Sequence, residues 1–176
     1  SPQLACAALP GARTVLDYCG GGGGKALAMA ACGSRVTAHD VDPRRMSDLP
    51  ARAARAGARI RLARSDELRA SFDMVVTDVP CSGSGTWRRT PDAKWRLQPA
   101  ELQQLLEVQA RILRQAADLV APQGHLAYMT CSVLQAENGD QIRGFLTDGA
   151  FAPVDERRFN PMNASDGFYL ALMRRC

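Results

Sequence analysis

Short apolar runs alternate with longer amphipathic segments along most of this chain. The apolar runs are rich in Val, Leu, Phe and Tyr and are bounded by Gly, Pro, Asp or Ser, which is typical of strands. Seven segments are predicted as strands on this basis, at 13–19, 35–41, 58–65, 72–80, 124–132, 151–159 and 167–175. The segment 72–80 is almost continuously apolar, so we expect it to be a buried strand in the middle of a sheet.

The amphipathic segments between these runs predict helices. The segment 99–120 is the clearest, because its apolar residues recur at the spacing of one helix face. Further helices are predicted at 26–32, 43–57 and 136–149. Pro43 suits the start of the second of these, and Pro50 should disturb it because proline has no amide proton to donate. Residues 81–98 are predicted to form a long loop, and such a long loop in a compact domain favours a functional role.

The order of these elements predicts an α/β fold. Strands that alternate with helices form a mostly parallel sheet with helices on both faces. The last two predicted strands follow each other without a long helix between them, so we expect an antiparallel hairpin at one edge. A length of 176 residues suits a single domain, 1–176, with one core.

The composition restricts the class of protein without identifying it. The net charge of +4 allows an anionic partner but does not require one. No apolar run is long enough for a membrane span, so no membrane association is predicted. The chain has neither a signal-peptide pattern nor an initiator Met, and we therefore expect it to be a piece of a longer cytoplasmic protein. We also expect a monomer.

The six cysteines are expected to be reduced thiols, since nothing indicates secretion. None of them forms a C-x-x-C pair, so no metal site is predicted. Only two of the 22 basic residues are lysines, Lys25 and Lys94, and both lie within motifs described below.

The run DYCGGGGGKA follows the first predicted strand and precedes the first helix. Consecutive glycines let the backbone approach a ligand closely, and in a doubly wound sheet this crossover faces the ligand crevice. The run fits neither a P-loop, which would need Ser or Thr at Ala26, nor a dinucleotide fingerprint, whose third glycine would fall on Lys25 or Leu27. A flexible turn without a ligand is the alternative.

Acidic residues stand at the ends of four predicted strands. They are Asp17, Asp40, Asp66 and Asp78. Carboxylates in these positions would complement a cationic cofactor without phosphates, such as S-adenosylmethionine, whose sulfonium and amino groups are positively charged. Each acid alone is weak support for this interpretation, because Asp in a loop is most often a solvated cap or turn residue.

Two cysteines, Cys81 and Cys131, stand where the fourth and fifth predicted strands end. Neighbouring strands lie about 5 Å apart, so both thiols could face one pocket beside the cofactor. A strand-end cysteine is often only a packing residue. A thiolate that adds to carbon 6 of cytosine, however, makes carbon 5 nucleophilic enough to accept a methyl group, and this chemistry needs a thiol, an acid and a methyl donor.

Four segments of the chain resemble those of the Sun-type (RsmB-like) RNA cytosine-5 methyltransferases. VLDYCGGGGGK is similar to their D-x-C-A-A-P-G-G-K motif. TDVPCSGSGTWRRTPDAKW matches their D-x-P-C-S-G-x-G-T-x-R-R-x-P-D-x-K-W motif almost residue for residue. YMTCSVLQAEN is similar to their Y-x-T-C-S-x-x-x-x-E-N motif, and DGFYLALM to their closing D-G-F-F strand. The resemblance implies a Rossmann-like class I methyltransferase fold with a seven-stranded sheet.

The resemblance also implies a division of labour between the thiols. In the family, the T-C-S cysteine, here Cys131, attacks carbon 6, and the P-C-S cysteine, here Cys81, assists product release. DNA cytosine methyltransferases use the proline–cysteine thiol as nucleophile, so Cys81 in that role is the mechanistic alternative. Asp78 would contact the cytosine and the methyl-donor end, and Lys25 would lie beside the reacting centre.

The cofactor and RNA contacts implied by the resemblance extend over several motifs. Asp40 would hold the ribose and Asp66 the adenine side. The residues expected to bind S-adenosylmethionine, which becomes S-adenosylhomocysteine, are Asp17, Cys19, Gly20, Gly21, Gly22, Gly23, Gly24, Lys25, Asp40, Val41, Asp66, Asp78 and Pro80. The residues expected to bind RNA are Trp87, Arg88, Arg89, Lys94 and Trp95, because Arg and Lys suit phosphates and Trp offers a stacking face.

The chain departs from the family pattern where Gly20, Gly21 and Gly22 replace A-A-P. Glycines cost ordering entropy, so we expect a looser loop that still binds the cofactor. The family's upstream RNA-targeting segment is not visible in this chain. The predicted substrate is RNA, most simply ribosomal RNA. The alternatives are a tRNA methyltransferase, a catalytically inactive RNA-binding module and a small-molecule methyltransferase.

Overall fold

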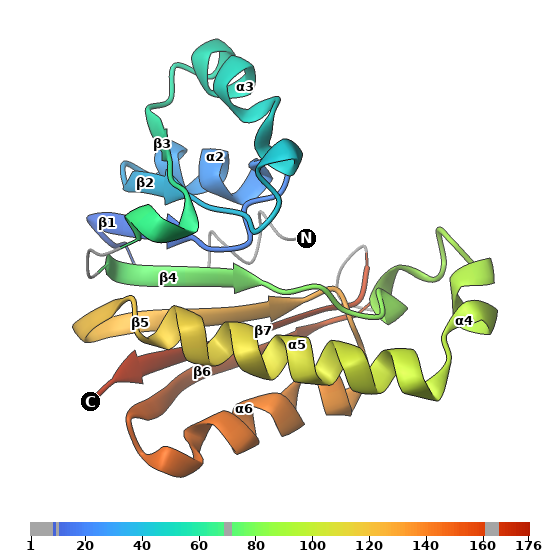
Figure 1. Cartoon of the computed structure of the whole chain (residues 1–176). Coiled ribbons are helices and arrows are strands. Elements are labelled where there is room, and N and C mark those ends of the chain that lie inside the picture. Colours follow the sequence, from blue (N-terminus) through green and yellow to red (C-terminus); the bar gives the residue numbers. More distant parts are fainter. Residues whose placement is uncertain (1–8, 10, 69–71, 161–165) are drawn as a thin grey trace.

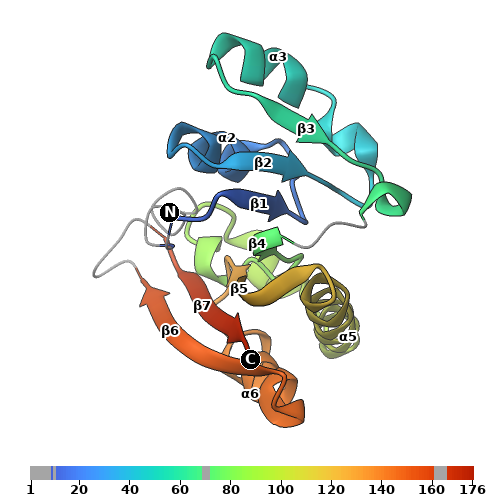
Figure 2. The ribbon, with the colours of Figure 1, turned by 90° about the vertical axis from the view of Figure 1, so that its left-hand side faces the viewer.

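A seven-stranded sheet forms the centre of the molecule in a computed structural model that describes residues 9, 11–68, 72–160 and 166–176 (Figure 1). The strands are β1 (Thr14–Asp17), β2 (Arg35–Ala38), β3 (Ile60–Leu62), β4 (Phe72–Asp78), β5 (Val120–Thr130), β6 (Phe151–Phe159) and β7 (Phe168–Arg175). Their order across the sheet is β3-β2-β1-β4-β5-β7-β6. Figure 2 shows how the sheet twists from β3 at one edge to β6 at the other.

Pairing in this sheet is parallel from β3 to β5 and antiparallel at the β7 and β6 end. The predicted hairpin is thus confirmed, with β7 inserted between β5 and the edge strand β6. Because β1, β2, β4 and β5 run in the same direction, their carboxyl ends meet at one edge of the sheet. In register, Asp78 at the end of β4 lies opposite Met129, two residues before Cys131.

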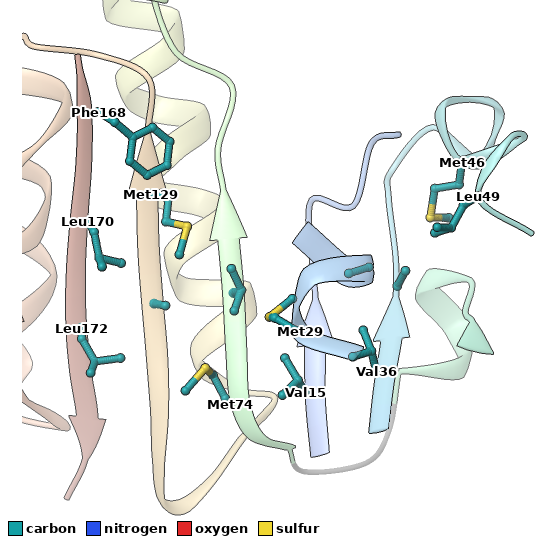
Figure 3. Close-up of a cluster of buried hydrophobic side chains, with 14 residues drawn as sticks. Val15, Met29, Val36, Met46, Leu49, Met74, Met129, Phe168, Leu170 and Leu172 are labelled. Atoms are coloured by element: carbon teal, nitrogen blue, oxygen red, sulfur yellow. The ribbon is translucent and has the colours of Figure 1, made fainter. Parts of the chain in front are cut away.

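Helices cover both faces of the sheet, as predicted. On the faces lie α2 (Gly24–Ala31), α3 (Leu49–Arg55), α5 (Pro99–Ala117) and α6 (Gly139–Phe145), whereas the short α4 (Asp92–Arg96) lies beyond the ends of β4 and β5. One core layer joins Met29 of α2 and Leu49 of α3 to side chains such as Val15, Met74 and Leu170 (Figure 3). The other layer joins α5 and α6 to the opposite face of the same strands.

Successive side chains of β4 point alternately into the two core layers. Met74 and Val76 belong to the layer with α2, whereas Val75 belongs to the layer with α5. All three side chains are at most 1% exposed. A strand buried on both faces reads as a continuous apolar run, which explains why the sequence predicts this strand so clearly.

Two segments differ from the sequence prediction. Residues 81–98 are not a plain loop, because they contain a 3₁₀ turn, Ser84–Thr86, and the short helix α4. Asp92 in the first turn of α4 and Arg96 in its last turn have the charges that the helix dipole favours. The predicted helix 43–57 is two elements, a 3₁₀ turn (Pro43–Met46) and α3, because Pro50 lies in the first turn of a new helix, where its missing amide proton is not needed.

The remaining boundaries shift by a few residues. β5 begins at Val120, four residues before the predicted start, and ends at Thr130, so that Cys131 is the first residue beyond it. The predicted helix 136–149 is α6 with a 3₁₀ turn on each side, Gln135–Glu137 and Leu146–Asp148. Among the described residues, no helix is both long and apolar enough to cross a membrane.

Candidate active site

A cavity of about 480 Å³ opens where β1, β2, β4 and β5 end, with α5 along one side. The ends of these strands and the loops after them contribute seven of the predicted site residues to its lining. These residues are Cys19, Asp40, Val41, Asp78, Pro80, Cys81 and Cys131. A second cavity, of about 540 Å³, lies between α5 and α6, and none of the predicted site residues lines it. The chemistry expected from the sequence therefore converges on the first cavity.

The glycine run forms a tight turn beneath this cavity rather than part of its lining. The Gly20 amide donates to the His39 carbonyl at 2.7 Å, which fixes the turn against the end of β2. Gly21 and Gly23 adopt positive φ angles of 47° and 76°, which glycine accepts without strain. A Cβ on Gly23 would also overlap the side chain of Leu49. The absence of side chains is thus required at these two positions.

Asp17, at the end of β1, is fully buried behind the cavity. Neither of its carboxylate oxygens makes a hydrogen bond of full geometry among the described residues. Burial raises the pKa of Asp17 from 3.8 to about 6, although the nearby Lys25 charge and the Ala26 backbone amide act in the opposite direction. A buried carboxylate without a partner fits a site for a cationic ligand, because a positive charge nearby would stabilise its ionised form.

Asp40 and Asp66 differ in their positions. Asp40 is buried, and its carboxylate accepts hydrogen bonds from the amides of Gly21 at 2.9 Å and Asp42 at 3.0 Å. It lines the cavity and retains lone pairs for a ligand hydroxyl. The Asp66 side chain is 74% exposed and does not line the cavity, whereas its neighbour Ser65 does. The structure therefore does not bring Asp66 together with the other predicted residues.

Lys25 and Asp78 form an ion pair at the end of β4. The Lys25 Nζ atom lies 2.8 Å from an Asp78 carboxylate oxygen, and the Lys25 side chain is only 9% exposed. A compact ammonium fits this confined place better than a planar guanidinium would. The pair places one positive and one negative charge beside the wall that holds the thiols.

The two predicted thiols face each other across adjacent strand ends. The Sγ atoms of Cys81 and Cys131 lie 3.3 Å apart, although the residues are 50 positions apart in the sequence. The hydrogen bond from Cys81 lowers the pKa of Cys131. The same bond, followed by burial, raises the pKa of Cys81. A pair that shares one hydrogen bond thus favours Cys131 as the thiolate and Cys81 as the thiol that donates to it.

Cys19 is a third thiol near the cavity, but its surroundings are different. Burial raises the pKa of Cys19 to about 12, and the charge of Asp17 adds to this effect. A thiol with such a pKa stays protonated at neutral pH and is a poor nucleophile. Of the cysteines that line the cavity, only the facing pair therefore suits nucleophilic chemistry.

A buried hydrogen-bond network connects the loops that carry the two thiols, and sequence reasoning gave it no role. It consists of Ser82, Ser84, Ser132 and Glu137, and we call it the serine–glutamate network. The Glu137 carboxylate accepts from the Ser82 amide at 2.8 Å and from the hydroxyls of Ser82 and Ser132. The hydroxyls of Ser84 and Ser132 lie 2.8 Å apart. The only signal for it in the sequence is that all three serines and the glutamate lie within the quoted motifs.

The predicted RNA-binding residues divide into two groups. The guanidinium groups of Arg88 and Arg89 lie 3.7 Å and 3.1 Å from the Asp166 carboxylate, so both already form an ion pair inside the protein. Lys94 and Trp95 belong to α4, which lies beyond the ends of β4 and β5 in Figure 1. The Lys94 ammonium lies 5.3 Å from the Trp95 ring centre, and Trp95 is 79% exposed. Trp87 is partly buried, with its indole nitrogen enclosed.

The chain matches the 16S rRNA methyltransferase RsmB/F family over residues 7–174. It belongs to this family. The family resemblance inferred from the motifs is thereby confirmed. Members of the family depend on S-adenosylmethionine, which confirms the cofactor predicted from the sequence.

Two curated relatives are similar to the chain over most of its length. A Mycobacterium tuberculosis protein named as a candidate methyltransferase is 40% identical over 159 residues, which cover 86% of this chain and 32% of the relative. The ribosomal RNA small subunit methyltransferase B of Thermus thermophilus is 32% identical over 184 residues, covering 96% of this chain and 46% of the relative. The chain therefore spans a third to a half of the length of these relatives.

A solved structure confirms the class I methyltransferase fold. The crystal structure of the protein PH0851 superposes with a TM-score of 0.89 and 30% identity, covering 99% of this chain and 45% of that one. A methyltransferase homologue from Pyrococcus horikoshii superposes with a TM-score of 0.84 at 24% identity, covering all of this chain and 66% of that one, and it supports the fold alone.

Proposed function

We propose that this protein transfers a methyl group from S-adenosylmethionine to carbon 5 of a cytosine in ribosomal RNA. The observation that carries the proposal is the facing pair of thiols, 3.3 Å apart, in the wall of a cavity that Asp40 and Asp78 also line. Membership in the RsmB/F family supports an RNA substrate, and the names of the curated relatives support ribosomal RNA.

The cofactor would lie between the ends of β1, β2 and β4. The residues of this region fit it, since the buried Asp17 carboxylate has no partner of its own and Asp40 lines the cavity beside the exposed apolar side chain of Val41. Asp40 would accept from the ribose hydroxyls, and Val41 would cover one face of the adenine ring. When bound, S-adenosylmethionine supplies the electrophilic methyl group.

The thiols would divide the reaction as follows. The Cys131 thiolate adds to carbon 6 of cytosine, and the electron pair displaced onto the ring makes carbon 5 the nucleophile that takes the methyl group. A base then removes the carbon 5 proton, the carbon 6–sulfur bond breaks, and the ring double bond returns. Cys81 assists that last step, since its Sγ atom lies 3.3 Å from that of Cys131 and its thiol can donate a proton toward the departing sulfur.

Asp78 and Lys25 would hold the base during these steps. Asp78 lines the cavity beside Cys81, and its ion pair with Lys25 fixes the direction of its carboxylate. From this position it would contact the cytosine ring. Lys94 and Trp95 would meet the RNA outside the cavity, the first at phosphates and the second by stacking on a base. The target cytosine has to leave its stack to reach the cavity.

Substitution of each thiol tests the proposal. The full-length protein is incubated with labelled S-adenosylmethionine and unmodified ribosomal RNA, and with RNA containing 5-fluorocytosine, which traps the covalent adduct. We expect Cys131→Ser to form no adduct and to lose methyl transfer by at least about a thousandfold. Cys81→Ser should form the adduct and release it slowly.

Two results would contradict the proposal. If the Cys131→Ser protein still forms the adduct, Cys81 is the nucleophile and the assignment of the two thiols is reversed. If the wild-type protein labels tRNA but not ribosomal RNA under the same conditions, the substrate class is wrong while the chemistry stands.

A further inference from the structure

Glu137 is a buried carboxylate that no ion pair among the described residues neutralises. Its side chain is fully buried, and it accepts hydrogen bonds from neutral groups only, namely the Ser82 amide, the hydroxyls of Ser82 and Ser132, and the side-chain amide of Gln109. Burying a charge without a counter-charge is costly unless several donors surround it. A carboxylate, which only accepts, matches a set of groups that all donate.

The groups that Glu137 joins are the immediate neighbours of the two thiols. Ser82 follows Cys81 after β4, and Ser132 follows Cys131 after β5. One carboxylate oxygen receives both serine hydroxyls, and the other receives the Ser82 amide. The Glu137 side chain therefore links the two loops that carry the thiols, which are 50 residues apart in the sequence.

Folding of this segment is secured by other groups. Asn138 accepts from the Thr130 hydroxyl at 2.7 Å and donates to the Ser132 carbonyl at 3.0 Å. The Tyr128 hydroxyl donates to the backbone carbonyl of Glu137 at 2.6 Å. These bonds hold the turn after β5 without the Glu137 side chain. The Glu137 carboxylate is therefore not needed to hold this turn, and its hydrogen bonds can set the spacing between the loops of Cys81 and Cys131.

We propose that Glu137 is a positioning residue, which holds Cys81 and Cys131 face to face through Ser82 and Ser132. Its catalytic consequence rests on the proposed function, but the spacing of the thiols does not. Without the carboxylate, the four donors lose a common acceptor and the two loops separate or fluctuate. Cys81 would then no longer meet Cys131 or the adduct that Cys131 forms.

Glu137 could act on the thiols through its charge or by positioning them. Removal of its carboxylate would have opposite effects in these two cases, so a substitution can distinguish them. For both thiols the hydrogen bond between them has the largest influence on the pKa, and the Glu137 charge is a smaller influence that raises the pKa of each. A neutral residue at this position would make the thiols more acidic and more reactive if the field alone mattered. A loss of function on neutralisation therefore indicates positioning.

Oxidation of the thiol pair tests the spacing without RNA or cofactor. Hydrogen peroxide converts the two thiols into one disulfide and two molecules of water, and the rate of the link between Cys81 and Cys131 is followed by mass spectrometry of the peptides. We expect Glu137→Gln to slow this link by at least about tenfold. The matched control is Asp140→Asn, which neutralises an exposed carboxylate three residues away. The side-chain partners of Asp140 are Gln135 and Arg143, not the serines beside the thiols, so this variant should leave the rate unchanged.

Turnover by the full-length protein gives the catalytic consequence. Glu137→Gln should lower kcat about tenfold or more, with the KM for RNA and the affinity for S-adenosylmethionine within about twofold of wild type. Disulfide formation at the wild-type rate in Glu137→Gln overturns the proposal, whatever turnover shows. Absence of methyl transfer in the wild-type protein counts against the proposed function and leaves the disulfide comparison intact.

A milder variant keeps the test decisive if Glu137→Gln does not fold. Ser82→Ala keeps the carboxylate and its bond from the Ser82 amide but removes one hydroxyl donor. It should slow disulfide formation in the same direction by about twofold to fivefold. An unchanged rate in a folded Ser82→Ala protein overturns the proposal as well.

Discussion

The two halves of the active-site edge are built in different ways. On the β1 and β2 side, the chain turns through consecutive glycines, and the Asp17 carboxylate is left without a partner among the described residues. On the β4 and β5 side, the serine–glutamate network satisfies the buried polar groups and fixes two thiols 3.3 Å apart. The first half offers room and charge to a ligand, whereas the second half holds reactive groups in place.

This difference fits the chemistry that we propose for each half. A bound cofactor brings its own hydrogen-bonding groups, so its site can remain incomplete until it arrives. Two thiols that act on one ring have to be in position before the ring arrives, because an error of about 1 Å costs about two orders of magnitude in rate. The predictions below challenge this contrast, in order of decreasing expected effect.

Gly85→Ala should have the largest effect, on the thiol side. The Gly85 amide donates to the Cys131 carbonyl at 3.0 Å and its carbonyl accepts from the Gly167 amide at 2.9 Å. A Cβ on Gly85 would overlap the backbone of Gly167, and backbone cannot rotate away. We expect the free energy of unfolding to fall by about 3 kcal/mol or more in urea titrations.

Gly144→Ala is the matched control for this substitution. A Cβ at Gly144, in α6, meets nothing within 4 Å, so alanine should raise the stability by about 0.5–1 kcal/mol through helix propensity. If the two substitutions changed the free energy of unfolding equally, the close approach of Gly85 to Gly167 would make no difference to stability.

Asp17→Asn should stabilise the ligand-free protein, on the cofactor side. Since burial raises the folded-state pKa of Asp17 from 3.8 to about 6, the favourable contribution of this group is complete below pH 3.8 and is lost as the pH rises through 6. Above that pH the wild type is less stable than it would be with a neutral group, by about 3 kcal/mol. The measurement is urea unfolding of both proteins at pH 4 and pH 7.5.

Asp17→Asn should therefore raise the free energy of unfolding by a large amount at pH 7.5 and by a small amount at pH 4. Calorimetric titration should show weaker S-adenosylmethionine binding by the same variant, because the unpartnered carboxylate no longer complements a cation. Asp118→Asn, at an exposed position after α5, should change neither quantity. A gain of equal size at both pH values would show that Asp17 does not titrate as its burial requires.

The sequence predicted those features that depend on local pattern and strand direction. The buried β4, the antiparallel β6–β7 hairpin and the meeting of Cys81 and Cys131 all follow from apolar runs and from parallel strands that end at one edge. The position of the glycine turn follows from the same pattern, because the turn comes after the first strand of a doubly wound sheet. Its contact with a cofactor stays a prediction.

The features that the sequence did not predict depend on contacts between distant segments. The role of Glu137 becomes visible only when the loops after β4 and β5 lie side by side. Arg88 and Arg89 looked available for RNA until Asp166 was found beside them. Asp66 lies outside the cavity because the 3₁₀ turn Ser65–Glu67 directs Ser65 to the cavity lining instead.

Gly22→Pro should have the smallest effect and tests whether the glycine turn is looser than it needs to be. The RsmB-like motif has proline at this position, and Gly22 has no positive φ angle. A Cβ there would meet only the end of the long Arg52 side chain at 3.3 Å, which also donates to the Gly22 carbonyl. Proline should stabilise the protein by about 0.5–1 kcal/mol by restricting the unfolded chain, and should tighten S-adenosylmethionine binding about twofold to fivefold. Gly21→Ala, at φ 47°, should do the reverse. Weaker binding by Gly22→Pro would show that the cofactor half needs its mobility.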